Sequence, residues 1–178
     1  MRVVAGELGG RKLISPPSRS RAVRPTSDRA RESLFSILGD LTDLSVLDLF
    51  CGTGALGIEA VSRGADSAVL VDTDPAIARR NVEALTVGRR CEVVRSDAIR
   101  YLKGTEVRFG LILCDPPYRL AGPVAPALSE HLPPHVARFG RLVVESSARE
   151  PLELELRRLD LEAERRIGEA LIRVYRRS

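Results

Sequence analysis

Residues 44–57 read LSVLDLFCGTGALG, and this stretch decides the fold. The mostly apolar run at 44–49 predicts a buried strand, and the residues at 54–63 predict a helix. A buried strand that leads through a glycine loop into a helix is typical of an open parallel α/β sheet. Such sheets bind ligands at the carboxyl ends of their strands, so this loop is the first place to expect a site.

The alternation of strands and helices extends through the rest of the chain. Apolar strand runs alternate with amphipathic stretches, which indicates a parallel sheet covered by helices on both faces. Near the C-terminus, Gly168-Glu169 joins two strand patterns and predicts an antiparallel hairpin that completes a mainly parallel, seven-stranded sheet. Strands are predicted at 44–49, 68–71, 91–94, 109–114, 141–145, 157–167 and 170–177, and helices at 28–38, 54–63, 75–85, after Asp97 and at 122–131.

The beginning of the chain follows a different pattern. Residues 1–14 alternate weakly around Glu7-Leu8-Gly9-Gly10, which predicts a small β-hairpin. Residues 15–27 (SPPSRSRAVRPTS) lack apolar periodicity and are rich in Pro, Ser and Arg, which predicts a loop. The sequence therefore divides into an N-terminal extension, 1–27, and a main domain, 28–178.

Positive charge is concentrated at the N-terminal end. Residues 1–31 carry eight Lys/Arg and two acids, whereas the other 147 residues carry 20 Lys/Arg and 22 acids. A basic end on a near-neutral body favours a polyanion partner such as RNA, although an ordinary solvated face would show the same pattern. The residues expected to bind RNA are Arg2, Arg11, Lys12, Arg19 and Arg21.

The composition also excludes several classes of protein. The chain has 178 residues, enough for one domain with its own core. No apolar run approaches the ~18 residues of a membrane span, and the first residues lack the apolar core of a signal peptide. We therefore expect a soluble cytosolic protein that does not bind a membrane.

Cysteine and histidine give no sign of a metal or redox site. Three cysteines, Cys51, Cys91 and Cys114, include no C-x-x-C pair, so buried free thiols are expected. His131 and His135 are four residues apart, as in a helical metal pair. Because Pro133-Pro134 lies between them and breaks the helix, we expect no metal site.

The glycine loop favours a ligand that carries an amino group. Gly52 and Gly54 let the backbone approach a ligand closely, and amides at the following helix start can meet a carboxylate. Asp48 lies four residues before Gly52, where its carboxylate could bind an amine but would repel a pyrophosphate. This acid argues against a dinucleotide, and a tight turn without a ligand remains the alternative.

Two further acids follow the next predicted strands. Asp72 stands 20 residues after Gly52, at the tip of the adjacent strand, where it can accept both hydroxyls of a ribose. NAD and S-adenosylmethionine sites share this feature. Asp97 follows the third strand and is placed to accept from an adenine amine. Each acid alone could be a helix cap or a solvated residue, but three beside a glycine loop favour a nucleoside ligand.

The fourth predicted strand ends in Asp115-Pro116-Pro117-Tyr118. Proline lacks an amide donor, and Pro116 keeps Asp115 out of helical geometry. The loop thus offers two acceptors, the Asp115 carboxylate and the Pro116 carbonyl, to the two N–H bonds of a flat exocyclic amine. Tyr118 offers a ring for stacking on a base. Such a loop can hold an aromatic amine and stabilise the positive charge that develops when its nitrogen is methylated. A rigid turn at the strand exit is the structural alternative.

The motifs together resemble a known family. DLFCGTGALGIEA at 48–60, followed by Asp115-Pro-Pro-Tyr118, is similar to the amino-methylating class I methyltransferases. VAGELGGRKL at 4–13 and RPTSDRARESLFSIL at 24–38 narrow the resemblance to the RsmD family of bacterial guanine-N2 methyltransferases. The similarity runs from residue 3 to about residue 147.

The resemblance implies a fold, a cofactor and a substrate. It implies a class I methyltransferase domain that uses S-adenosyl-L-methionine to methylate the N2 amine of a guanine in the helix-31 loop of 16S ribosomal RNA. The partner would be the small ribosomal subunit or its assembly intermediate, and we expect the protein to act as a monomer. The implied catalytic residues are Asp115, Pro116 and Tyr118, and the implied cofactor-binding residues are Asp48, Phe50, Gly52, Gly54, Asp72, Thr73, Asp97, Ala98, Arg24 and Thr26.

Two other functions remain open from the sequence. The acceptor loop would serve any exocyclic amine, so a DNA adenine-N6 or cytosine-N4 methyltransferase is the alternative enzyme. DNA enzymes generally need extra mass to hold a flipped base, and this chain has no room for a target-recognition domain. A non-catalytic RNA-binding module that retains the fold is the other alternative, against which the intact Asp115 and Tyr118 argue.

Overall fold

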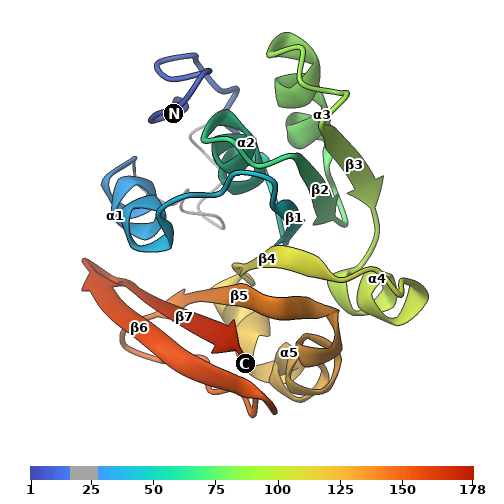
Figure 1. Ribbon diagram of the computed structural model, residues 1–178, viewed down its shortest axis with the longest axis vertical. Coiled ribbons are helices and arrows are strands. Elements are labelled where there is room, and N and C mark those ends of the chain that lie inside the picture. Colours follow the sequence, from blue (N-terminus) through green and yellow to red (C-terminus); the bar gives the residue numbers. More distant parts are fainter. Residues whose placement is uncertain (17–27) are drawn as a thin grey trace.

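A seven-stranded sheet forms the centre of the computed structural model, which describes residues 1–16 and 28–178 (Figure 1). The strand order is β3-β2-β1-β4-β5-β7-β6. The strands are β1 (Ser45–Leu49), β2 (Ser67–Asp72), β3 (Cys91–Arg95), β4 (Phe109–Cys114), β5 (Val136–Ser147), β6 (Leu159–Ile167) and β7 (Ala170–Arg177). The helices are α1 (Asp28–Leu38), α2 (Ala55–Ser62), α3 (Ala76–Ala84), α4 (Ala98–Gly104) and α5 (Tyr118–His131), with a 3-10 turn, η1, at Pro133–His135.

The directions of the strands confirm the predicted sheet. Strands β1 to β5 pair in parallel, and β7 pairs antiparallel with both β5 and β6. Because the strand order reverses direction at β1, the loops after β1 and β4 lie on either side of the topological switch point. The fold is therefore an open, mainly parallel, Rossmann-like sheet with a C-terminal antiparallel hairpin.

Each face of the sheet has its own hydrophobic core. Side chains alternate between the two faces along a strand, so Val46 and Leu47 of β1 enter different cores. Helices α1, α2 and α3 and the N-terminal segment pack on one face, whereas α4 and α5 pack on the other. Asp48 lies two residues after Val46 and therefore faces α2.

Residues 1–13 form a compact antiparallel turn, as predicted. A single bridge joins Arg2 to Lys12, and the Val3 amide donates to the Arg11 carbonyl at 2.9 Å. Gly6 has a φ of 81°, and its missing side chain lets the turn approach α2, because a Cβ there would lie 1.8 Å from the Ser62 carbonyl oxygen. Residues 1–13 are thus packed against the main domain.

Two element boundaries differ from the predictions by more than two residues. Helix α5 begins at Tyr118 rather than at 122, because the Pro117 carbonyl accepts from the amides of Leu120 and Ala121 and starts the helix one turn earlier. Strand β5 begins at Val136 rather than at 141. Phe139 has a φ of 61° within it, and the register with β4 shifts there, as in a β-bulge.

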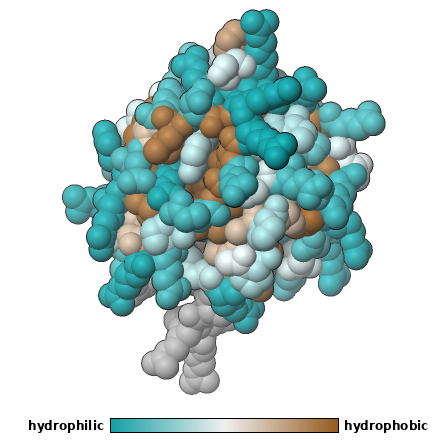
Figure 2. Space-filling view, turned by 90° about the horizontal axis from the view of Figure 1, so that it is seen from below, coloured by the Kyte–Doolittle hydropathy of each residue, from teal (hydrophilic) through white to brown (hydrophobic). Residues whose placement is uncertain are grey.

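Hydrophilic side chains dominate the face of the molecule that Figure 2 shows. Figure 2 views the molecule from below Figure 1, on the side of α5 and β6, and shows hydrophobic side chains gathered among hydrophilic ones near the middle of that face. In the described part of the chain, no helix is both long and apolar enough to cross a membrane. The three cysteines are buried free thiols, as predicted.

Candidate active site

Four loops meet at the carboxyl edge of the central strands. Leu49 of β1 pairs with Cys114 of β4 and with Val71 of β2, and Asp72 of β2 pairs with Arg95 of β3. The residues that follow these strands therefore begin at similar levels along one edge. This register brings the glycine loop between its two neighbours, with the Asp115 loop on one side and the Asp72 turn on the other.

The glycine loop has an unusual backbone. Phe50, Gly52 and Gly54 have positive φ angles of 60°, 53° and 75°. A Cβ at Gly52 would project into open space, so the bare backbone there can meet a ligand. A Cβ at Gly54 would lie 3.0 Å from Leu70 Cδ1 and 3.3 Å from Ala78 Cβ. Gly54 thus permits α2 to pack closely on β2 and α3.

Asp72 holds the glycine loop in place. Its Oδ2 accepts a hydrogen bond from the Gly52 amide at 2.9 Å, and its Oδ1 accepts from the Asp74 amide at 2.9 Å. The Cys51 amide also donates to the Val71 carbonyl at 3.1 Å. The carboxylate that we expect beside a ribose therefore also fixes the loop that would cradle the rest of the ligand.

Asp48 is buried beneath the loop. It is 1% exposed, and its Oδ2 accepts from the Gly57 amide at 2.9 Å near the start of α2. Burial raises the pKa of this carboxyl to about 7; the Gly57 hydrogen bond opposes that shift, and the nearby charge of Asp72 adds to it. In this structure Asp48 joins strand to helix, and its predicted contact with a ligand amine stays a prediction.

The third strand-end acid caps a helix. Asp97 is the N-cap of α4, and its side chain accepts from the Arg100 amide at 3.0 Å. This is the structural role that the sequence left open for it. Asp97 is exposed, as is Thr73, and Ala98 is buried at the start of α4. Contact of these three residues with an adenine or ribose stays a prediction.

The Asp115-Pro116-Pro117-Tyr118 segment leads from β4 into α5. Asp115 is half-buried, Pro116 is buried and Tyr118 is 51% exposed. The Pro117 carbonyl is used to start α5, because it accepts from Leu120 at 2.7 Å. Of the two proline carbonyls, the one of Pro117 is thus occupied by the helix, which leaves the one of Pro116 for a ligand. The exposed ring of Tyr118 lies where it can meet a base.

The predicted RNA-binding residues are only partly described. Arg2 is exposed and lies 3.6 Å from Asp28, the Arg11 guanidinium donates to the Ala84 carbonyl at 3.4 Å, and Lys12 is exposed. These three share the N-terminal turn, so the structure brings them together. The other two residues predicted to bind RNA, Arg19 and Arg21, lie outside the described residues, as do Arg24 and Thr26, which were predicted to bind the cofactor.

Three buried polar side chains were not assigned a role from the sequence. Glu59 accepts from the amides of Val4 and Ala5 at 2.7 and 2.9 Å. Ser62 accepts from the Leu8 amide at 3.0 Å. The third residue, Asn81 on α3, contacts both the N-terminal segment and the glycine loop. A polar residue on the apolar face of a predicted helix, such as Asn81 beside Ala78 and Val82, was the available signal.

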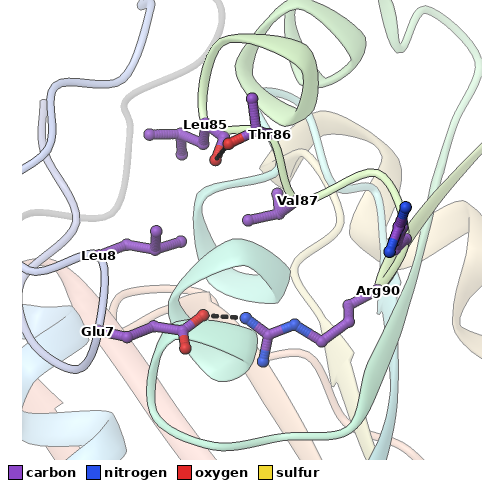
Figure 3. A pocket seen from close by; sticks show the side chains of 7 residues that line it. Glu7, Leu8, Leu85, Thr86, Val87 and Arg90 are labelled. Carbon is purple, nitrogen blue, oxygen red and sulfur yellow. Dashed lines mark hydrogen bonds and ion pairs between the residues drawn. The ribbon is translucent and has the colours of Figure 1, made fainter.

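Two cavities among the described residues lie away from the predicted catalytic and cofactor residues. Figure 3 shows a cavity of about 390 Å³ where Glu7 and Leu8 of the N-terminal turn face the connection between α3 and β3. An ion pair between Glu7 and Arg90 spans it. The other cavity, of about 860 Å³, lies beside α5 and the 153–158 segment.

No group of three or more potential metal ligands occurs within residues 1–16 and 28–178. His135 is buried, and its Nδ1 lies 2.9 Å from the Val107 carbonyl oxygen. This contact gives the buried His135 a structural role at the end of η1.

Known proteins resemble this chain in both sequence and structure. A family model described as conserved hypothetical protein 95 matches residues 1–176. "Ribosomal RNA small subunit methyltransferase D" of Escherichia coli is 39% identical over 67% of this chain and 61% of its own length. YlbH of Bacillus subtilis, named as a candidate rRNA methyltransferase, is 40% identical over 67% of each chain.

A solved structure gives the same result over a longer range. The Escherichia coli protein yhhF is 32% identical, with a TM-score of 0.81 over 100% of this chain and 98% of its own. The sequence alignment with the Escherichia coli methyltransferase D, by contrast, spans about 61% of that relative. On the family model and these similarities, the chain belongs to the conserved hypothetical protein 95 family, which is the RsmD family that its motifs resemble.

Proposed function

We propose that this protein is an S-adenosyl-L-methionine-dependent methyltransferase that acts on the N2 amine of a guanine in the small-subunit ribosomal RNA. The observation that carries the proposal is the register of β1 and β4, which sets the glycine loop beside the Asp115 loop. A cofactor cradle and an amine-binding loop thus begin at one edge of the sheet, as methyl transfer between their ligands requires.

The residues at this edge fit the cofactor. The open space in front of Gly52 is a cradle that any side chain at this position would enter. Asp72 and Asp97 supply carboxylates for hydroxyl and amine groups of the nucleoside, and the start of α2 supplies amides for a carboxylate. When bound, the cofactor supplies an electrophilic methyl group.

The Asp115 loop supplies what the acceptor amine needs. The lone pair of an aromatic amine is delocalised into the ring, so the nitrogen is a poor nucleophile. The Asp115 carboxylate and the Pro116 carbonyl accept hydrogen bonds from the two N–H groups of the amine. They thereby orient its nitrogen and stabilise the positive charge that develops on it. Asp115 can then take the released proton. Tyr118 stacks on the base and holds it against the loop.

The choice of RNA rests on the N-terminal extension and on the relatives. Arg2, Arg11 and Lys12 lie together on the N-terminal turn, which gives the molecule a basic surface. Two relatives carry names that specify ribosomal RNA methylation. We propose a guanine in the helix-31 loop of 16S RNA, within the small subunit or its assembly intermediate, as the target.

Mass mapping of 16S RNA tests this assignment. In a strain that lacks the gene, one methylguanosine in the helix-31 loop is expected to be missing, and the purified protein is expected to restore it in vitro. Small subunits, naked 16S RNA and DNA oligonucleotides are compared as substrates. A methylated guanine in the deletion strain, with no second enzyme present, would refute the assignment. Transfer of methyl groups to DNA alone would favour the alternative enzyme.

A further inference from the structure

The Asn81 side chain joins the N-terminal segment to the glycine loop. Asn81 is 1% exposed, and its Oδ1 accepts from the Ile14 amide at 2.7 Å. Its Nδ2 donates to the Ile14 carbonyl at 3.1 Å and to the Thr53 carbonyl at 2.9 Å. An amide side chain has two donor hydrogens and an acceptor oxygen, so this one group connects two segments that are distant in sequence.

The glycine loop requires such support. Phe50 adopts the left-handed region, which is unfavourable for a residue with a side chain, and Gly52 and Gly54 have positive φ as well. Backbones in sparsely populated conformations persist only when their surroundings fix them. Hydrogen bonds to β2 fix the first half of the loop, through Cys51 and Gly52. The Asn81 bond fixes the second half.

The Asn81 contact lies at Thr53, the point where the glycine loop leads into α2. A trans peptide places its C=O and N–H on opposite sides, so a contact that fixes the Thr53 carbonyl also directs the Gly54 amide. That amide donates to the Cys51 carbonyl at 2.7 Å and closes the turn before α2. Asn81 therefore controls the junction where loop becomes helix, next to the place expected for the cofactor carboxylate.

We propose that Asn81 is a positioning residue that couples the order of residues 1–16 to occupancy of the glycine loop. The proposal rests on the proposed function, because it takes S-adenosylmethionine and its product as the ligands of the loop. The coupling must be reciprocal. A ligand that stabilises the glycine loop also stabilises the contact between Asn81 and Ile14, and loss of that contact weakens binding of the ligand. The segment at Ile14 then supports the cofactor site, while Arg11 and Lys12 before it offer a surface for RNA.

Substitution of Asn81 tests the contact with the loop. Asn81→Ala removes all three hydrogen bonds, and we expect the dissociation constant of S-adenosylhomocysteine, measured by calorimetry, to rise about tenfold. The KM for S-adenosylmethionine should rise with it, while kcat at saturating cofactor should change less than about threefold, because the group acts on binding rather than on the chemical step.

Ser62→Ala is the matched control. Ser62 is also buried and also holds the N-terminal turn, through the Leu8 amide at 3.0 Å and the Ala5 carbonyl at 2.5 Å. Its hydrogen bonds within the described chain do not reach the glycine loop. We expect it to lower the melting temperature as Asn81→Ala does, but to raise the dissociation constant far less, because it leaves the bond from Asn81 to Thr53 in place and acts only through the order of the turn. Equal weakening in both variants, or none in Asn81→Ala, would overturn the proposal.

Hydrogen exchange gives a test whose refuting outcome is read from the wild-type protein alone. S-adenosylhomocysteine is expected to slow exchange in peptides covering residues 1–16, and Asn81→Asp should abolish that protection. The aspartate keeps an acceptor for the Ile14 amide but loses both donors. If the wild type binds S-adenosylhomocysteine and exchange in 1–16 does not change, the coupling is refuted. If the wild type does not bind it at all, the proposed function fails instead.

Discussion

A buried carboxyl group, Asp48, makes folding sensitive to pH. It is 1% exposed, and burial raises its pKa to about 7, from an ordinary value near 3.9. Between these two pKa values the folded chain holds a proton that the unfolded chain has lost. Stability is therefore greatest below pH 4 as far as this group is concerned, and it falls as pH rises through 7.

The Asp48→Asn variant is expected to lose this pH dependence. Asparagine keeps an oxygen for the Gly57 amide but cannot ionise. Urea denaturation between pH 4 and 8 should show the unfolding free energy of the wild type falling relative to the variant, by up to about 4 kcal/mol. Parallel pH curves for the two proteins would show that Asp48 keeps an ordinary pKa.

Asp115 belongs to the same edge but has a different expected role. Because it lies in the loop beyond β4 and not in the glycine loop, Asp115→Ala should leave binding of S-adenosylhomocysteine unchanged. Loss of an acceptor that stabilises developing charge should lower kcat about 10²–10³-fold. Calorimetry and methyl transfer to small subunits separate the two effects. If cofactor binding is lost together with turnover, Asp115 has a structural role.

At the scale of elements, the N-terminal turn is docked on α2 through Gly6. A Cβ at Gly6 would lie 1.8 Å from the Ser62 carbonyl oxygen, whereas a Cβ at Gly10 would meet nothing within 4 Å. Both glycines have a φ close to 80°. Gly10→Ala therefore measures the cost of the backbone conformation alone, about 1–2 kcal/mol. Gly6→Ala adds a backbone clash.

We expect Gly6→Ala to destabilise the protein by about 1–3 kcal/mol more than Gly10→Ala, because the turn must move away from α2. Thermal unfolding measures the difference, and hydrogen exchange of residues 1–16 shows whether the turn has separated. Equal loss in the two variants would mean that the turn is not packed on α2 in solution.

The sequence predicted helices and strands well where the spacing of apolar residues agrees with the residues that end an element. The run at 109–114 matches β4 at both ends, and Gly39 follows α1 with a φ of 64°, as expected of a helix stop. It failed where backbone geometry overrides side-chain pattern. A bulge at Phe139 lets β5 continue across Arg138 and Gly140. Such a bulge cannot be recognised from the alternation of apolar and polar residues.

The sequence predicted those parts of the candidate site that depend on strand topology, but not those that depend on how helices pack. Motif residues such as Gly52, Asp72 and Asp115 follow strands, so their placement at one edge follows from the parallel topology. Contacts between distant segments leave no local pattern. The bond from Asn81 to Thr53 and the bonds from Glu59 to Val4 and Ala5 depend on how helices pack, which spacing along the chain does not encode.

At the scale of the whole molecule, charge and chemistry are connected through the N-terminal segment. Arg11 and Lys12 lie three and two residues before Ile14, which Asn81 links to the glycine loop. These two basic residues therefore stand close in sequence to a segment held against the candidate cofactor site. RNA bound by Arg11 and Lys12 would then contact a segment that is linked to the glycine loop of the candidate site, which suits a substrate that is already folded and exposed.

The salt dependence of RNA binding tests this arrangement. If Arg11 and Lys12 each contact a phosphate, the Arg11→Ala/Lys12→Ala double variant should flatten the plot of log affinity against log salt by about 1.4–1.8. It should also raise KM for the small subunit and leave kcat unchanged. The double variant Arg108→Ala/Arg157→Ala removes the same charge beside the α5 cavity and serves as the control. Because net charge falls equally in both, equal flattening would show that RNA responds to total charge rather than to contacts on the extension.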